Sequence, residues 1–170
     1  TVKETFVAEG THPVEMQRQG WQAIMQNFKA YAEKPGTLNT MHFQAVIKAP
    51  VNKVYDTMLA PESYKTWTAI FNPSSRYEGS WETGAKLHFI GEDKEGNTGG
   101  MVSRIKENAP NRFVSIEHLG ILQNGEEITS GPAVEAWAGA LESYTFTVED
   151  GHSLLSVDVD SSPEHHAYFF

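Results

Sequence analysis

Apolar residues at helical spacing predict one long amphipathic helix near the start of the chain. Between residues 12 and 33 they recur at i, i+3, i+4, i+7 and i+11, as Trp21, Ile24, Met25, Phe28 and Ala32. This spacing gathers them into one stripe along a helix. Pro13 suits the first turn, and Lys34-Pro35-Gly36 is typical of an end. We therefore expect a single helix over residues 12–33.

Two shorter helices are predicted to follow a strand. Residues 40–48 alternate as a strand does, and Ala49-Pro50 stops the alternation. Apolar residues then fall at relative positions 0, 3, 4, 7 and 8 from Val51 to Leu59, which predicts a short helix closed by Pro61. A second short helix is expected over residues 62–67.

The rest of the chain alternates like successive antiparallel strands. We expect strands over residues 76–82, 85–91, 100–107, 112–120, 138–148 and 153–160, and a short one over residues 1–9. Glu149-Asp150-Gly151 predicts a hairpin turn, and residues 123–132 a long, polar, exposed loop. Such a sheet must bury its apolar face, and only the helix over residues 12–33 is long enough to cover it.

Composition narrows the classes of function. The chain has 9 Phe, 6 Tyr and 4 Trp, which suit a thick core or a lined cavity. A net charge of −9 argues against binding to nucleic acid or to anionic membranes. Cysteine is absent, which excludes disulfides and thiolate nucleophiles. No run approaches 18 apolar residues. We expect a cytoplasmic protein, with no membrane partner and no cofactor.

Six runs within residues 40–170 carry a family resemblance: HFQAVIKAPVNKVYDTMLAPESYKTW, YEGSWETGAKLHF, GGMVSRIKE, FVSIEHLG, WAGALESYTF and LLSVDVD. Together they resemble the START-like SRPBCC superfamily, and within it the bacterial branch named after the C-terminal domain of the activator of the heat-shock ATPase. The resemblance implies an α+β helix-grip fold. In that fold a curved antiparallel sheet, here of about six or seven strands, grips one long helix over an apolar cavity, with two short helices beside it.

Both ends depart from the family pattern. The last residues, SSPEHHAYFF, resemble the opening of the family's long C-terminal helix, whereas residues 1–34 resemble the last strand and helix of another member. We therefore expect a strand-and-helix element over 1–34, a linker over 35–39, and a helix-grip domain over 40–170 that lacks most of its own C-terminal helix. The chain is either a piece of a tandem protein or arranged like a circular permutant. The helix over 12–33 would fill the groove of its own chain or, in a domain-swapped homodimer, that of a partner.

Strand alternation and the resemblance select the residues expected to contact a ligand. The predicted ligand-binding residues are Trp67, Phe71, Trp81, Phe89, Met101, His118, Trp137, Glu142 and Tyr144. For their apolar members, a place in the core is the alternative interpretation. His118 and Glu142 are the polar residues expected on the inward face. They would form either a general base with its orienting carboxylate or a satisfied hydrogen-bonded pair.

The sequence lacks the residue spacing that a metal site, a phosphate-binding loop or a serine nucleophile requires. His165-His166, Glu164 and His12 match no metal-ligand pattern, so no metal site is expected. The glycines of residues 91–100 do not form a phosphate-binding loop, and no GxSxG motif is present.

Three hypotheses on function result. The first is the binding of a small apolar or amphipathic molecule between sheet and helix, as the resemblance implies. The second is a partner protein that associates with a chaperone, in the style of the heat-shock ATPase activator. The third is an enzyme resembling the family's cyclases and dehydratases, with His118 and Glu142 as its only candidate centre. We favour binding over catalysis.

Overall fold

The computed structural model describes residues 5, 7, 10–32 and 38–161 and divides the chain into two units, Thr1–Thr37 and Leu38–Phe170. Helix α1 (Val14–Ala32) of the first unit confirms the predicted long helix. The strand expected over residues 1–9 falls mostly outside the described residues, and Thr5 and Val7, which are described, are not in a strand.

The polar and apolar residues of α1 are arranged as in an amphipathic surface helix. Glu15 in its first turn and Lys29 in its last both suit the helix dipole, and Arg18 pairs with Glu15 at 2.8 Å. On the apolar stripe, Trp21 is 36% exposed and Phe28 57%.

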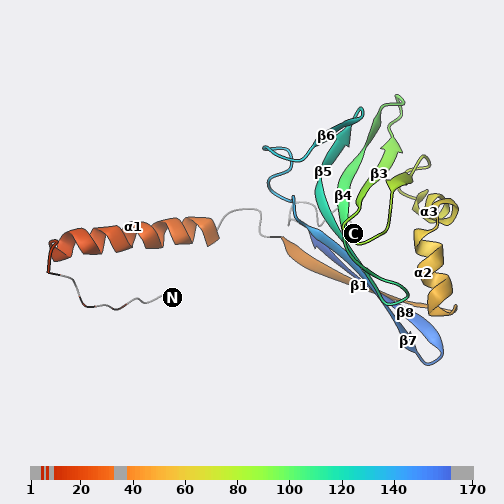
Figure 1. Cartoon of the computed structure of the whole chain (residues 1–170), viewed down its shortest axis with the longest axis horizontal. Helices are drawn as coiled ribbons and strands as arrows, with labels where there is room; N and C mark the ends of the chain where they lie inside the picture. The colour runs from red at the N-terminus through yellow and green to blue at the C-terminus, as the bar shows by residue number, and fades with distance from the viewer. Residues whose placement is uncertain (1–4, 6, 8–9, 33–37, 162–170) are drawn as a thin grey trace. The chain divides into compact units, whose positions relative to one another are not determined.

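The second unit is a curved antiparallel sheet with two short helices (Figure 1). Its elements are β1 (Asn39–Ile47), α2 (Val51–Leu59), α3 (Pro61–Thr68), β2 (Arg76–Gly79), β3 (Lys86–Glu92), β4 (Thr98–Ala109), β5 (Phe113–Gln123), β6 (Glu126–Ile128), β7 (Leu141–Glu149) and β8 (His152–Ser161). The strand order is β1-β8-β7-β5-β4-β3-β2, and β6 pairs with β5. The sheet has 8 strands because β6 forms inside the segment predicted to be a loop, which corrects that prediction.

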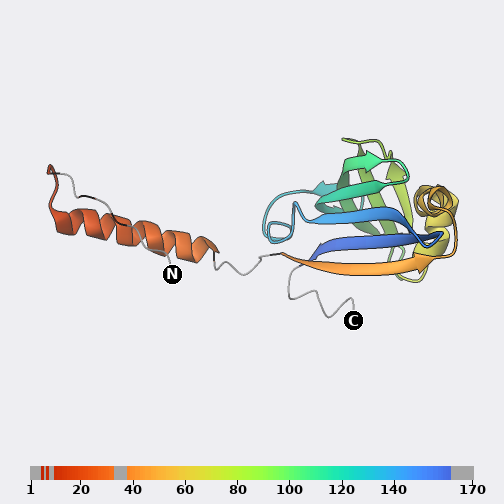
Figure 2. The same cartoon turned by 90° about the horizontal axis from the view of Figure 1, so that it is seen from below.

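Helices α2 and α3 lie at one end of the curved sheet, as Figures 1 and 2 show together. Pro61 occupies the first turn of α3, as expected of a residue that lacks an N–H to donate. The hairpin between β7 and β8 turns at Asp150 and Gly151, whose φ angles of 49° and 77° suit a tight turn. The predicted turn at residues 149–151 is thus confirmed.

The core lies on the face of the sheet that α2 covers. Strand register places Phe43, Val157, Tyr144 and Val114 side by side across β1, β8, β7 and β5. The buried members of the core are Val54, Met58, Leu59, Leu87, Ile105, Val114, Ile116 and Phe146. We refer to this side of the sheet as the core face. Not all of it is covered, since Phe43 is 36% exposed.

Candidate functional site

An inner pocket of about 190 Å³ opens on the core face where α2 and α3 meet the sheet. Helix α3 contributes Tyr64 and Trp67, and strands β3 and β4 contribute Phe89 and Met101. The complete lining is Met58, Tyr64, Trp67, Trp81, Phe89, Met101, Ile116, Glu142 and Tyr144. The pocket is thus mostly aromatic and aliphatic, with one carboxylate.

Aromatic rings around the inner pocket pack against one another. The Tyr64 ring meets the Trp67 ring edge-on, with centroids 5.2 Å apart, and stacks on Phe89 at 5.9 Å. Trp81 contacts Phe89, also at 5.9 Å. Aromatic rings at such centroid distances prefer offset-stacked or edge-to-face arrangements, and these contacts stabilise the packing. The pocket wall is therefore held in place by its own side chains.

Glu142 forms the polar end of the inner pocket. Its Oε2 lies 3.2 Å from Nε2 of His118, and its Oε1 accepts a hydrogen bond from the Tyr144 hydroxyl. Nδ1 of His118 in turn lies 3.0 Å from the hydroxyl of Ser103, which is fully buried. Each carboxylate oxygen thus has one protein partner, and a chain of hydrogen bonds fixes the orientation of the carboxylate.

The same contacts determine the protonation of this end of the pocket. Burial raises the pKa of Glu142, but its hydrogen bond and charge interaction with His118 and its hydrogen bond from Tyr144 together lower that pKa below its ordinary value. Burial and the Glu142 charge raise the pKa of both Tyr144 and Tyr64. At neutral pH the pocket therefore holds an ionised carboxylate beside two protonated phenols.

The side chain of Trp81 carries a buried donor that has no partner within the described part of the chain. The indole Nε1 of Trp81 is inaccessible to solvent, and no hydrogen-bond acceptor reaches it among the described residues. An unpaired buried N–H destabilises a protein by about 1–3 kcal/mol. The indole N–H of Trp67, by contrast, donates to the Met58 carbonyl at 3.4 Å.

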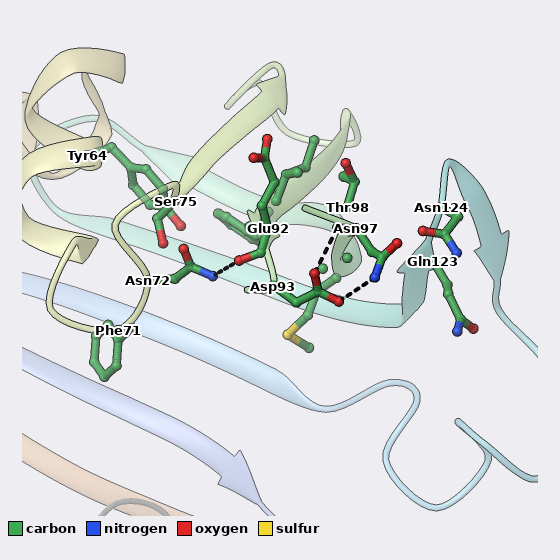
Figure 3. A pocket seen from close by; sticks show the side chains of 16 residues that line it. Tyr64, Phe71, Asn72, Ser75, Glu92, Asp93, Asn97, Thr98, Gln123 and Asn124 are labelled. Atoms are coloured by element: carbon green, nitrogen blue, oxygen red, sulfur yellow. Dashed lines mark hydrogen bonds between the residues drawn. The ribbon is translucent and has the colours of Figure 1, made fainter. Parts of the chain in front are cut away.

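An outer pocket of about 720 Å³ shares Tyr64, Phe89 and Met101 with the inner one. Its rim is polar, as Figure 3 shows. Asn72 donates from Nδ2 to the Glu92 carbonyl at 2.9 Å. Gly91 permits this contact, because a Cβ there would lie 2.7 Å from the Asn72 amide nitrogen.

A turn held by Asp93 forms another part of the outer rim (Figure 3). The Asp93 carboxylate accepts hydrogen bonds from the backbone N–H and the side-chain amide of Asn97, both at 2.8 Å. These bonds lower the pKa of Asp93, so its carboxylate is ionised at neutral pH.

The structure brings most of the predicted site residues together. Those that line the inner pocket are Trp67, Trp81, Phe89, Met101, Glu142 and Tyr144. Phe71 lines the outer pocket and is 71% exposed. His118 is 7% exposed and lies behind Glu142, so it positions the carboxylate. Trp137, which was expected to contact a ligand, lies in the turns between β6 and β7 and lines neither pocket.

Sequence reasoning missed Met58, Tyr64 and Ile116. Met58 and Tyr64 belong to the short helices, whereas the candidates were selected from strand alternation and from loops. The apolar spacing of α2 could have indicated Met58, because an amphipathic helix turns that face toward the sheet. Ile116 belongs to both the buried core and the pocket lining, and strand alternation alone does not separate these two roles. Among the described residues, no group of three or more His, Asp or Glu is arranged to hold a metal ion.

Comparison with known proteins identifies the architecture. No family model and no curated protein matches the chain. Solved structures do: the Aha1 dimer from Colwellia psychrerythraea is 17% identical, with a TM-score of 0.52 over 73% of this chain and 76% of that one. Protein Ms6760 from Mycobacterium smegmatis is 18% identical, with a TM-score of 0.55 over 80% of each chain. This is the helix-grip fold. It confirms the expected α+β class.

A third helix-grip relative is DynU16, a protein in the dynemicin biosynthetic locus. It is 17% identical, with a TM-score of 0.52 over 76% of this chain and 41% of its own. Identities this low show the fold alone. No α-helix within the described residues combines the length and apolarity that crossing a bilayer requires.

Proposed function

We propose that this protein binds a small apolar or amphipathic molecule in the inner pocket. The observation that carries the proposal is a cavity of about 190 Å³ walled by aromatic rings, with the oriented carboxylate of Glu142 at one end. Ligand sites are typically mostly apolar, with few polar groups that fix orientation. A cavity of about 150 Å³ suffices for benzene, so the inner pocket has room for an aromatic ring.

Native mass spectrometry of freshly purified protein, with calorimetric titration of the neutral dye N-phenyl-1-naphthylamine, tests the proposal. We expect a co-purified small molecule or micromolar dye binding. Met101→Trp places a larger side chain where both pockets are lined and should abolish binding. Val46→Trp, at an exposed residue of β1, is the control and should bind as the wild type does. Equal binding by the two variants, or no binding by the wild type, would contradict the proposal.

We also propose that the chain is related to the START-like SRPBCC superfamily, and within it to the branch of heat-shock ATPase activators. The sequence runs quoted above and the fold shared with the Colwellia Aha1 support it. Association with a cytoplasmic chaperone is the alternative function. Recovery of a chaperone together with the purified protein, and of no small molecule, would favour that alternative.

Catalysis is the second alternative, and the contacts of Glu142 weigh against it. Glu142 reaches the pocket, whereas His118 lies behind it. Because its contacts lower the pKa of Glu142, the carboxylate is a weaker base than an ordinary glutamate. Such a group suits the orientation of a ligand better than the removal of a proton.

For the N-terminal unit, we propose that the apolar stripe of α1 covers the open part of the core face of its own chain. Ile24 and Phe28 of the stripe are 52% and 57% exposed, and Phe43 of the core face is 36% exposed, so packing them together would remove apolar surface from water. Residues 33–38 separate α1 from β1, and six residues can span up to ~20 Å. Because the relative from Colwellia is described as a dimer, the exchange of α1 between two copies is the alternative.

A further inference from the structure

The charged side chains that line the two pockets all have the same sign. Glu142 lines the inner pocket, and Glu92 and Asp93 line the outer one. No Lys, Arg or His is among the described residues that line either pocket. Arg76 pairs with Glu92 at 3.2 Å and Asp93 is bonded to its own turn, whereas Glu142 ends the inner pocket beside its contacts with His118 and Tyr144.

Glu142 retains hydrogen-bonding capacity on the pocket side. A carboxylate offers about four lone-pair sites, and the contacts with His118 and Tyr144 occupy one on each oxygen. The Glu142 side chain is 26% exposed, so a ligand in the pocket can reach its carboxylate.

Like the carboxylates, the aromatic wall of the inner pocket favours a positively charged ligand. The rings of Tyr64, Trp67, Trp81, Phe89 and Tyr144 line the cavity. A cation within about 6 Å of such a ring face is attracted by the ring quadrupole, most strongly when water is excluded. An anionic head group would instead lose its hydration next to Glu142 and be repelled by it. A neutral molecule would gain only packing and hydrogen bonds.

We propose that the ligand is an organic cation: a protonated amine on an aromatic or otherwise apolar body, with its ammonium group against Glu142. The inference rests on the proposed binding function and narrows it to one class of ligand. The apolar body lies among the rings, and the ammonium donates to the free lone pairs of the carboxylate.

Three probes that share one apolar body test the inference: 1-naphthylmethylamine, 1-naphthylmethanol and 1-naphthoate, titrated calorimetrically at pH 7. We expect the amine to bind at least about tenfold more tightly than the alcohol, and the carboxylate to bind least. Raising the salt concentration should weaken amine binding more than alcohol binding. These comparisons use the wild-type protein, so they do not depend on the folding of a variant.

Glu142→Gln keeps the size of the side chain and removes its charge, so it should bring the affinities for amine and alcohol together. Glu149→Gln, on the same strand but lining neither pocket, is the control and should keep the preference. An alcohol that binds as tightly as the amine would overturn the inference and leave the binding function standing. If neither the three probes nor the neutral dye binds, the binding function itself fails.

Discussion

The imidazole of His118 lies 3.2 Å from the carboxylate of Glu142, although the two residues are not opposite each other in the sheet. In the pairing of β5 with β7, Glu142 faces Ile116, and the backbone N–H of His118 donates to the Ala140 carbonyl. Diagonal neighbours on one face of a sheet are within reach of long side chains. The contact thus results from strand pairing, and it sets the direction of the carboxylate that ends the inner pocket.

Replacement of His118 by Gln separates positioning from catalysis. Gln keeps a hydrogen-bond donor of comparable size but removes the titratable ring. For a positioning role, the affinity for 1-naphthylmethylamine should change by about 0.5–1.5 kcal/mol, the net contribution of one hydrogen bond. Titration calorimetry measures this. A roughly 100-fold loss of turnover of a co-purified ligand, with unchanged affinity, would instead show that His118 is catalytic.

Stability should depend on pH through Glu142. The pKa of Glu142 in the folded protein is lowered from 4.5, so its contribution is present above 4.5 and is lost as pH falls through the folded value. His118, Tyr144 and Tyr64 are the titratable groups that interact with it. Denaturant unfolding between pH 6 and pH 3 should therefore show a shallower decline in Glu142→Gln than in the wild type. The Glu149→Gln control should follow the wild type, and parallel curves for all three proteins would contradict this assignment.

The location of the core can be tested with two valines. Val114 is fully buried in the core cluster, whereas Val148, on β7, is 69% exposed. Val114→Ala should lower the free energy of unfolding by about 1.5–3 kcal/mol, because it removes buried apolar surface. Val148→Ala should change it by less than ~0.5 kcal/mol. Equilibrium unfolding in urea measures both, and similar losses would show that the core is misplaced.

The packing of α1 can be tested at Trp21. If its stripe covers the core face, Trp21→Ala should lower the free energy of unfolding by about 3–5 kcal/mol. Gln22→Ala, at an exposed polar position of the same helix, should have little effect. Urea unfolding measures both variants, and light scattering measures the oligomeric state. Equal, small effects in the two variants would refute the packing, and a dimer would show exchange between copies.

Local pattern determined most of the elements of this protein. The 3.6-residue spacing of Trp21, Ile24 and Phe28 predicted α1, and the Val51–Leu59 spacing predicted α2. Both predictions succeeded because the position of an apolar residue along a helix decides which face it takes. Strand alternation likewise placed His118 and Glu142 on one face. It missed β6, because three residues are too few to show a period.

The tertiary structure alone decided which of these side chains meet. Tyr64 and Met58 join Phe89 in one pocket because α2 and α3 pack at one end of the sheet, which no periodicity within a single element encodes. Trp137 falls outside both pockets for the same reason: the course of the turns after β6 sets its position. The sequence by itself thus determined the elements and their faces through local spacing. The site depends on contacts between residues distant in the chain, and only packing selects those contacts.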